Sequence, residues 1–152
     1  MEEPLGRAVA YTGKVVSERF DAYLNQHDSS VPTWLVLKHV GNEDGLSQRE
    51  LAGRIGIEGP TLVRHLDRME AEGLVARRRD DHDRRIVRIS LTTNGRRRHA
   101  HLIEVVSKLD AQLRALLTER EVQVLERALR RIREEWFPEA TPERSMHVRA
   151  GR

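Results

Sequence analysis

The sequence predicts a mainly α-helical protein with one small β-hairpin, which places it in the α+β class. Two patterns predict this. Apolar residues recur at intervals of three and four along most of the 152 residues, which is the period of a helix with one buried face. One short stretch, residues 86–91, instead alternates apolar and polar residues, which is the period of a half-buried strand. The expected fold is therefore a set of packed helices that carries a single β-ribbon.

Two helices are predicted at the start of the chain. The first covers Leu5 to Asn25, where Val9 and Phe20 belong to an apolar stripe with spacings of three and four. A polar turn with a proline then precedes a second helix, predicted from Thr33 to Val40. Gly41 and the polar residues after it are expected to end this helix. The break separates the leading helices from the segment that follows.

Capping signals place the next two helices. Ser47 and Glu50 form an S-x-x-E capping box, in which each side chain bonds a backbone N–H of the other, so a short helix is expected over Gln48 to Ile55. A glycine-rich turn follows. Pro60 suits the first position of the next helix because that position needs no N–H donor, and this helix is predicted to run to Glu72. Its buried face is expected to hold Leu62, Leu66 and Met69.

A β-hairpin follows that helix. Strands are predicted over Val75 to Arg79 and Ile86 to Leu91, joined by an acidic turn, Asp80 to Asp83. In the second strand the apolar residues face one way and the polar residues, such as Arg88, face the other. Helix, turn, helix and hairpin in this order are typical of a winged helix-turn-helix, which we predict for residues 32–93.

The rest of the chain is predicted to be mostly helical. One helix begins near Asn94, and a second capping box, Thr118 with Glu121, opens another helix that ends near Trp136. Both carry apolar stripes, formed by Leu102, Val105 or Val106, Leu109, Leu113 and Leu116 in one and by Val122, Leu125, Leu129, Ile132 and Trp136 in the other.

These stripes, with that of the first helix, are more apolar than a small winged-helix core requires. We therefore predict that residues 5–31 and 94–137 form a helical dimerisation domain. The alternative is that the stripes wrap the core of their own subunit. Residues 138–152 contain scattered charges and almost no apolar periodicity, so they are predicted to be a disordered tail.

The composition excludes several classes of function. The chain has no cysteine, which rules out disulfides, thiolate metal sites and a thiol-based redox switch. Its seven histidines do not gather into a metal-binding pattern, and no nucleophile, paired carboxylate or phosphate loop stands out, so neither an enzyme nor a cofactor is expected. No apolar run approaches the length of a membrane span or a signal-peptide core, so the protein is expected to be cytoplasmic.

Positive charge is concentrated around the hairpin. Thr61 to His99 contains eleven arginines against six acidic residues, a net charge of +5, whereas the whole chain has +3. Such a field favours a polyanionic partner, and duplex DNA is the natural candidate.

The helix before the hairpin has the residues of a DNA-reading element. A recognition helix enters the major groove by its first turns, and Thr61 and Arg64 lie there. Arginine can bond guanine O6 and N7 together, whereas a threonine hydroxyl can bond a phosphate or a base. The alternative for Arg64 is a solvated side chain paired with Glu58 or Asp67. Because the hairpin follows directly, we favour DNA recognition.

Two adjacent arginines stand at the predicted hairpin tip. Arg84 and Arg85 follow Asp83, and we expect Asp83 to pair with one of them and fix the hairpin, which leaves the other to enter the narrow minor groove. The alternative is a charged, solvated turn without a ligand. Four strand arginines are expected to contact phosphates: Arg77, Arg78, Arg79 and Arg88. The DNA-binding set that we predict is Ser47, Gln48, Pro60, Thr61, Arg64, His65, Arg68, Arg78, Asp83, Arg84, Arg85 and Arg88.

The segment IGIEGPTLVRHLDRMEAEGLVARR, followed by DHDRRIVRISLT, resembles the MarR family of bacterial transcription regulators, close to its SlyA-like branch. The core of the resemblance covers Ser47 to Gly95, and the flanking helices fit the family layout from Leu5 to about Trp136. It implies a homodimer that places two recognition helices in successive major grooves of a palindromic site, roughly 34 Å apart. At the matching positions, Arg64 falls on the family's recognition-helix arginine, and Arg84 and Arg85 fall on its wing-tip pair.

The same resemblance implies a cleft for small aromatic carboxylates or phenols between the dimerisation helices and the winged helix. In this chain the cleft would be lined by Tyr11, Lys14, Thr33, Trp34 and Lys38. A cation beside an aromatic wall, here Lys14 with Trp34, is what a planar anion needs. The alternative is that both lysines are solvated and that Trp34 belongs to the core.

The sequence thus predicts a dimeric, sequence-specific regulator of transcription, by default a repressor, that a small anion controls. The rival function is a winged-helix module that binds an acidic protein partner. Arg64 separates the two, because a protein-binding wing does not require an arginine at the start of a groove-reading helix.

Overall fold

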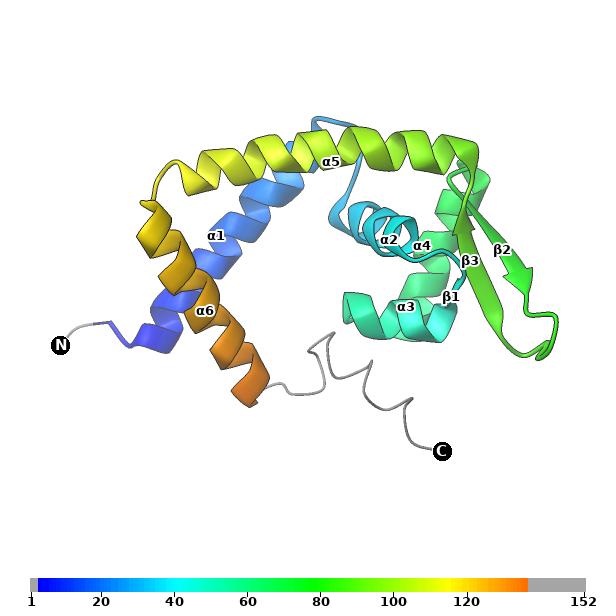
Figure 1. The fold of residues 1–152 in the computed structure, drawn as a ribbon, viewed down its shortest axis with the longest axis horizontal. Coiled ribbons are helices and arrows are strands. Elements are labelled where there is room, and N and C mark those ends of the chain that lie inside the picture. The colour runs from blue at the N-terminus through cyan, green and yellow to red at the C-terminus, as the bar shows by residue number, and fades with distance from the viewer. Residues whose placement is uncertain (1–2, 137–152) are drawn as a thin grey trace.

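The computed structural model describes residues 3–136, which form six helices and a small three-stranded antiparallel sheet (Figure 1). In chain order the elements are α1 (Leu5–Asn25), α2 (Val31–Asn42), β1 (Leu46–Ser47), α3 (Gln48–Ile55), α4 (Gly59–Ala71), β2 (Val75–Arg79), β3 (Val87–Leu91), α5 (Thr93–Arg114) and α6 (Glu119–Trp136). The long helix α5 joins an arm made of α1 and α6 to a winged-helix unit made of α2, α3, α4 and the sheet (Figure 1). This mainly helical architecture with a small sheet confirms the predicted fold class.

Capping explains where several helices begin. The Ser47 hydroxyl accepts a hydrogen bond from the Glu50 N–H at 3.1 Å, and the Ser47 N–H donates to the Glu50 carboxylate at 3.0 Å, so the first capping box is confirmed. The second box is confirmed as well, because the Thr118 N–H donates to the Glu121 carboxylate at 2.7 Å. Both boxes orient the first turn of a helix, α3 and α6, as the sequence predicts.

Helix α2 begins two residues earlier than predicted and ends later. The Ser30 hydroxyl caps it by accepting a hydrogen bond from the Thr33 N–H at 3.4 Å, which starts the helix at Val31. Gly41 does not end it. A Cβ at Gly41 would come within 2.4 Å of the His99 ring on α5, so this glycine serves the close packing of α2 on α5.

The sheet contains one strand that the sequence does not reveal. β1 is only two residues long and pairs antiparallel with β3, with Leu46 opposite Ile89, to give the strand order β1-β3-β2. Two residues are too few to show an alternating pattern. β3 also begins one residue later than predicted, because Ile86 closes the turn by donating its N–H to the Asp83 carbonyl at 2.9 Å.

The core lies between the end of α1, α2, α3, α4, the sheet and the first half of α5. Its largest fully buried side chains are Leu24, Val36, Leu37, Val40, Leu46, Leu51, Leu62, Leu66, Met69, Val75, Ile89 and Leu102. At one edge, a Cβ on Gly95 would lie 1.9 Å from the Leu74 carbonyl oxygen. Only glycine therefore allows the start of α5 to lie against the segment between α4 and β2.

The apolar stripes of the outer helices stay largely exposed in the single chain. Leu113 of α5 is 42% exposed, Leu125 of α6 is 46% exposed and Trp136 is 70% exposed. In α1 only Leu24 is buried. The alternative that these helices wrap the core of their own subunit is therefore wrong for much of their length.

Some expectations lie beyond this description. The predicted disordered tail, residues 138–152, lies outside the described residues. The division into a dimerisation domain and a winged-helix domain stays a prediction. Between residues 3 and 136, no helix has both the length and the apolar character that crossing a bilayer requires.

Candidate nucleic-acid interface

Helix α4 presents one apolar face to the core and one polar face to solvent. It begins at Gly59, one residue before the predicted start, with Pro60 in its first turn, and it ends at Ala71. The predicted buried face is confirmed, because Leu62, Leu66 and Met69 are all buried. The predicted reading residues lie away from it: Thr61 and His65 are half-buried, and Arg64 and Arg68 are exposed.

Arg64 makes no hydrogen bond or ion pair with any residue between 3 and 136. The alternative pairing with Glu58 or Asp67 is not formed. Asp67 instead binds Arg77, with 2.6 Å between its Oδ1 and the Arg77 Nη2. The Arg64 guanidinium therefore keeps all its donors available on the exposed side of α4.

Arg77, which the sequence predicts to contact phosphate, instead joins the hairpin to α4 within the chain. Its Nη2 lies 2.6 Å from Asp67 Oδ1 and 2.6 Å from Glu70 Oε2, and its backbone N–H donates to Glu70 Oε1 at 3.2 Å. The side chain is only 21% exposed. The hydrogen bond with Glu70 raises the pKa of Arg77 and lowers the pKa of Glu70. We call Arg77, Asp67 and Glu70 the Arg77 cluster.

The tip of the hairpin has the arrangement that the sequence predicts. Asp83 binds Arg85 in a bidentate pair, with Arg85 Nε 3.0 Å from Oδ1 and Nη2 2.9 Å from Oδ2. The Arg85 side chain, through this hydrogen bond, lowers the pKa of the Asp83 carboxyl. Arg84 is exposed, and its side chain has no hydrogen bond or ion pair within the described part of the chain. Arg79 supports the tip by donating to the Arg84 carbonyl at 2.8 Å.

A second carboxylate, Asp80, holds the turn of the hairpin, directly after β2. It forms an ion pair with Arg88 and accepts backbone hydrogen bonds from His82 at 2.9 Å and Asp83 at 3.0 Å. Arg88 also donates to the Gly45 carbonyl at 3.0 Å. These contacts, led by the Arg88 hydrogen bond, lower the pKa of Asp80 to about 2. Within the chain, Arg88 thus stabilises the hairpin.

The sequence did not identify Asp80 as a support. Asp80 and Arg88 are eight positions apart and meet only because β2 and β3 are paired. The one signal in the sequence is the repeated acid before the arginine pair, Asp80, Asp81 and Asp83, which does not tell which carboxylate bonds which arginine.

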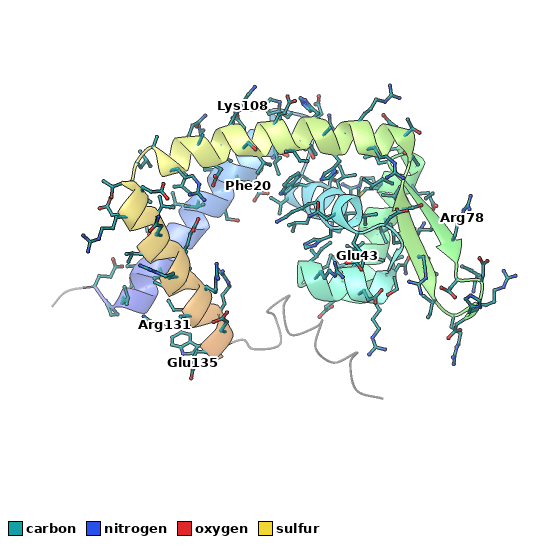
Figure 2. All side chains as sticks on the ribbon, in the orientation of Figure 1. Phe20, Glu43, Arg78, Lys108, Arg131 and Glu135 are labelled. Carbon is teal, nitrogen blue, oxygen red and sulfur yellow. The ribbon has the colours of Figure 1, made fainter. Side chains whose placement is uncertain are left out.

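The other predicted residues divide between support and exposure. The Ser47 hydroxyl is bonded to Glu50 in the capping box, and Gln48 is half-buried at the start of α3. Arg78 is exposed on β2 and forms no bond to the described residues; Figure 2 shows its side chain extending away from the helices. The exposed arginines of α4 and of the hairpin that lack such a partner are Arg64, Arg68, Arg78 and Arg84.

The five predicted ligand-binding residues do not form one cluster in the described part of the chain. Trp34 is 8% exposed and belongs to the core, with its ring centroid 6.2 Å from that of His99. Lys14 and Tyr11 are exposed on α1, where Lys14 Nζ lies 3.8 Å from Glu18. Thr33 accepts a hydrogen bond from Ser30, and Lys38 is exposed on α2. No hydrogen bond or ring contact in residues 3–136 joins any two of the five.

No group of three or more histidine, aspartate or glutamate side chains in the described part of the chain is placed to hold a metal ion. An α-helix with exposed arginines lies beside a hairpin whose turn is fixed by two carboxylates, Asp80 and Asp83 (Figure 1). The fold is a winged helix-turn-helix with additional helices at both ends.

Comparison with known proteins finds one matching family model and several similar solved structures. The model of the MarR family matches residues 27–86. The transcriptional repressor CouR, bound to a 23-mer DNA duplex, is 29% identical with a TM-score of 0.80 over 85% of this chain and 92% of that chain. A mutant of E. coli MarR complexed with operator DNA is 28% identical with a TM-score of 0.78 over 85% and 93%. The chain is therefore similar to the MarR family model in its winged-helix segment and to these two regulators in its fold.

A further relative shows the same fold at lower identity. The PcaV transcriptional regulator from Streptomyces coelicolor, in complex with its natural ligand, is 23% identical. Its TM-score is 0.77 over 88% of this chain and 97% of that chain. At this identity the likeness concerns the fold alone.

Proposed function

We propose that the protein is a sequence-specific regulator of transcription that binds double-stranded DNA at a pseudo-palindromic operator. One observation carries the proposal. Among residues 3–136, Arg64 is exposed without a partner on α4, next to a hairpin whose tip leaves Arg84 equally unpaired. An unpaired guanidinium on a helix beside a second one on a projecting ribbon matches the two grooves of a duplex. CouR and MarR, which are similar in structure, were both solved with DNA.

The proposed contacts follow from exposure. Arg64 reads a guanine in the major groove, with Thr61, Pro60 and His65 beside it. Arg84 enters the minor groove. Arg68 and Arg78 bind phosphates, with Ser47 and Gln48 at the start of α3. Asp83, Arg85 and Arg88 act as positioning residues, since their side chains already bind one another or the backbone.

We propose that the functional unit is a homodimer. The exposed apolar stripes of α1, α6 and the second half of α5 favour contact with a second copy, because large unpaired apolar faces are costly in water. Residues 5–31 and 94–137 would form the dimerisation domain, and residues 32–93 the DNA-binding domain. Two-fold symmetry then places the recognition helices about one turn of DNA, roughly 34 Å, apart.

We also propose that the protein is a cytoplasmic repressor that a small aromatic anion releases from DNA. The support is that PcaV, of the same fold, was solved with its natural ligand. Tyr11, Lys14, Thr33, Trp34 and Lys38 remain the proposed lining. Titration calorimetry with phenolic carboxylates tests this, and equal heats for the wild type and Lys14→Ala would contradict it. Assignment to the SlyA-like branch rests on the wing sequence alone.

The main test is selection of bound DNA from a random pool, followed by anisotropy titrations of the selected duplex at several salt concentrations. The expected result is a palindromic consensus with affinity that falls steeply with salt. Absence of salt-sensitive binding to any duplex would overturn the proposal. The rival function is binding of an acidic protein partner. It predicts that Arg64→Ala leaves the affinity for that partner unchanged.

A further inference from the structure

A polar cavity lies at the junction of the DNA-binding and dimerisation elements. It has a volume of about 520 Å³ and is lined by the α1–α2 turn, the end of α4 with the residue after it, and the start of α5. This volume is in the range of small-molecule sites. Of the residues predicted from the sequence to bind a ligand, only Thr33 lines it.

One buried hydroxyl in this cavity lacks a partner. Ser29 is 9% exposed, and its Oγ makes no hydrogen bond to any described residue. Buried polar groups nearly always have partners, because an unsatisfied one is destabilising. Ser29 lines the cavity, so a molecule bound there can supply the missing hydrogen bond.

Four charged side chains line the same cavity without pairing with one another. Arg68 lies in the last turn of α4 and Glu72 directly follows that helix, Asp28 lies on the α1–α2 turn and Arg98 lies on α5. No ion pair joins any of the four, although ion pairs form elsewhere in the described residues. The Arg98 Nη2 donates hydrogen bonds to the His27 carbonyl, at 2.6 Å, and to the Asp28 carbonyl. The other N–H groups of this guanidinium remain for a ligand.

The lining defines the chemistry of the ligand. It holds two cations and two anions, and Leu74 is its only apolar side chain. An aromatic carboxylate would find no apolar wall here and would meet two unpaired acids. We propose that this cavity binds a small zwitterion, namely a free α-amino acid. Its carboxylate binds Arg98 and the Ser29 hydroxyl near the start of α2, and its ammonium binds Asp28 and Glu72.

This site differs from the aromatic-anion cleft in place and in chemistry, and it has a link to DNA. Arg68 lies both in the cavity and among the exposed arginines of α4. A bound amino acid whose carboxylate also draws Arg68 inward removes that arginine from a phosphate. The second step, weaker DNA binding, rests on the proposed function; the binding of the amino acid does not.

Titration calorimetry of the full chain without DNA tests the site. The common L-amino acids are added one at a time, and for the one that binds, its N-acetyl and amide derivatives follow. We expect the wild type to bind the zwitterion and to lose affinity at least about tenfold with either derivative, since each lacks one charge. No binding by any amino acid, or equal binding of a derivative or of glycerol, would overturn the proposal.

Two variants locate the binding. Ser29→Ala and Glu72→Gln should each weaken it about tenfold, while Ser107→Ala, which lies outside the cavity on the exposed side of α5, should not. Glu72 is exposed, so its variant keeps the test valid even if Ser29→Ala fails to fold. Unchanged affinity in Glu72→Gln would contradict the site.

Anisotropy with the selected duplex then separates the two proposals. An amino acid that binds in calorimetry should lower DNA affinity in the wild type and not in Glu72→Gln. If it binds without changing DNA affinity, the site stands and the link to DNA is wrong. If the protein binds no DNA at all, the proposed function fails and the calorimetric result is unaffected.

Discussion

Neighbouring arginines in the hairpin have opposite roles. Arg77 binds two carboxylates, while Arg78 beside it has no bond to the described residues; Arg85 is held by Asp83, while Arg84 is not. For the first pair the cause is the alternation of a strand, which points successive side chains to opposite faces. For the second pair it is the turn geometry around Asp83. Arginine content alone therefore says little about which side chains can meet a polyanion.

The first residue-scale prediction concerns base reading. Arg64→Ala should weaken binding of the selected duplex by about 1–3 kcal/mol and relax the base preference, as loss of a bidentate guanine contact does. Anisotropy titrations with the selected and a scrambled duplex measure both effects. Arg120→Ala, an equal loss of charge at an exposed position of α6, is the control. Equal losses in the two variants would mean that Arg64 contributes only general charge.

The second concerns the wing tip. Arg84→Ala should lower affinity for selected and scrambled duplexes alike and should reduce the slope of log K against log salt by about 1, because a minor-groove arginine acts mainly through the electrostatic potential. The same titrations over a range of salt measure it. A salt slope equal to that of the wild type would show that Arg84 stays in solvent.

At the scale of elements, the hairpin is fixed at two places. The Arg77 cluster ties β2 to α4, and Asp80 with Arg88 ties the turn to β3 and, through the Gly45 carbonyl, to the segment before β1. Both connections use charge-assisted hydrogen bonds, which are shorter and stronger than neutral ones. The position of the wing relative to α4 is thereby set before any ligand binds.

Loss of the Arg77 cluster should lower the stability of the fold, beyond the effect of removing one positive charge. Arg77→Ala should lower the free energy of unfolding by about 1 kcal/mol, near the upper range for exposed pairs, because Asp67 and Glu70 are both partly solvated. Arg78→Ala removes the same charge from the next position and should leave stability unchanged. Urea denaturation of both variants measures the difference, and similar midpoints would contradict a structural role for Arg77.

Acid should destabilise the turn of the hairpin only at very low pH. The Asp80 carboxyl titrates at about 2 in the folded chain against an ordinary value of 3.8, so its stabilising effect is fully present above 3.8 and is lost as the pH falls through 2. An NMR titration of the Asp80 carboxyl carbon measures the midpoint. Arg88→Gln should raise it toward 3.8; an unchanged midpoint would assign the shift to the backbone donors alone.

The sequence predicted the bounds of helices and strands better than it predicted which side chains pair. Capping residues and periodicity are local, so α1, α3, β2 and both capping boxes are as predicted. The pairing of Asp80 with Arg88 depends on the register of the hairpin, and the pairing of Arg77 with Asp67 and Glu70 depends on how β2 packs on α4, so neither role was readable from the sequence. The pairing of Asp83 with one of two arginines was predicted because all three are adjacent; which arginine it takes was not.

At the scale of the whole molecule, the winged-helix unit buries its apolar side chains in its own core, whereas the helical arm leaves many of its apolar side chains exposed. A charge in the exposed stripe should therefore affect assembly more than folding. Leu125→Glu should convert the proposed dimer to a monomer in sedimentation velocity, because a carboxylate would be buried at the interface without a partner. Ser107→Glu, on the exposed side of α5, should remain dimeric. A monomeric wild type would contradict the dimer directly.

The contact between Gly95 and Leu74 gives the long helix α5 a mechanical role. The 22 residues of α5 span about 33 Å at a rise of 1.5 Å per residue. Its first turn is seated on the backbone beside the wing, so the helix and the wing base turn together. A tilt of about 10° at one end of such a rod displaces the other end by about 6 Å, which equals the width of a minor groove. Any such tilt of α5 would reach the wing through the seat of Gly95 on Leu74.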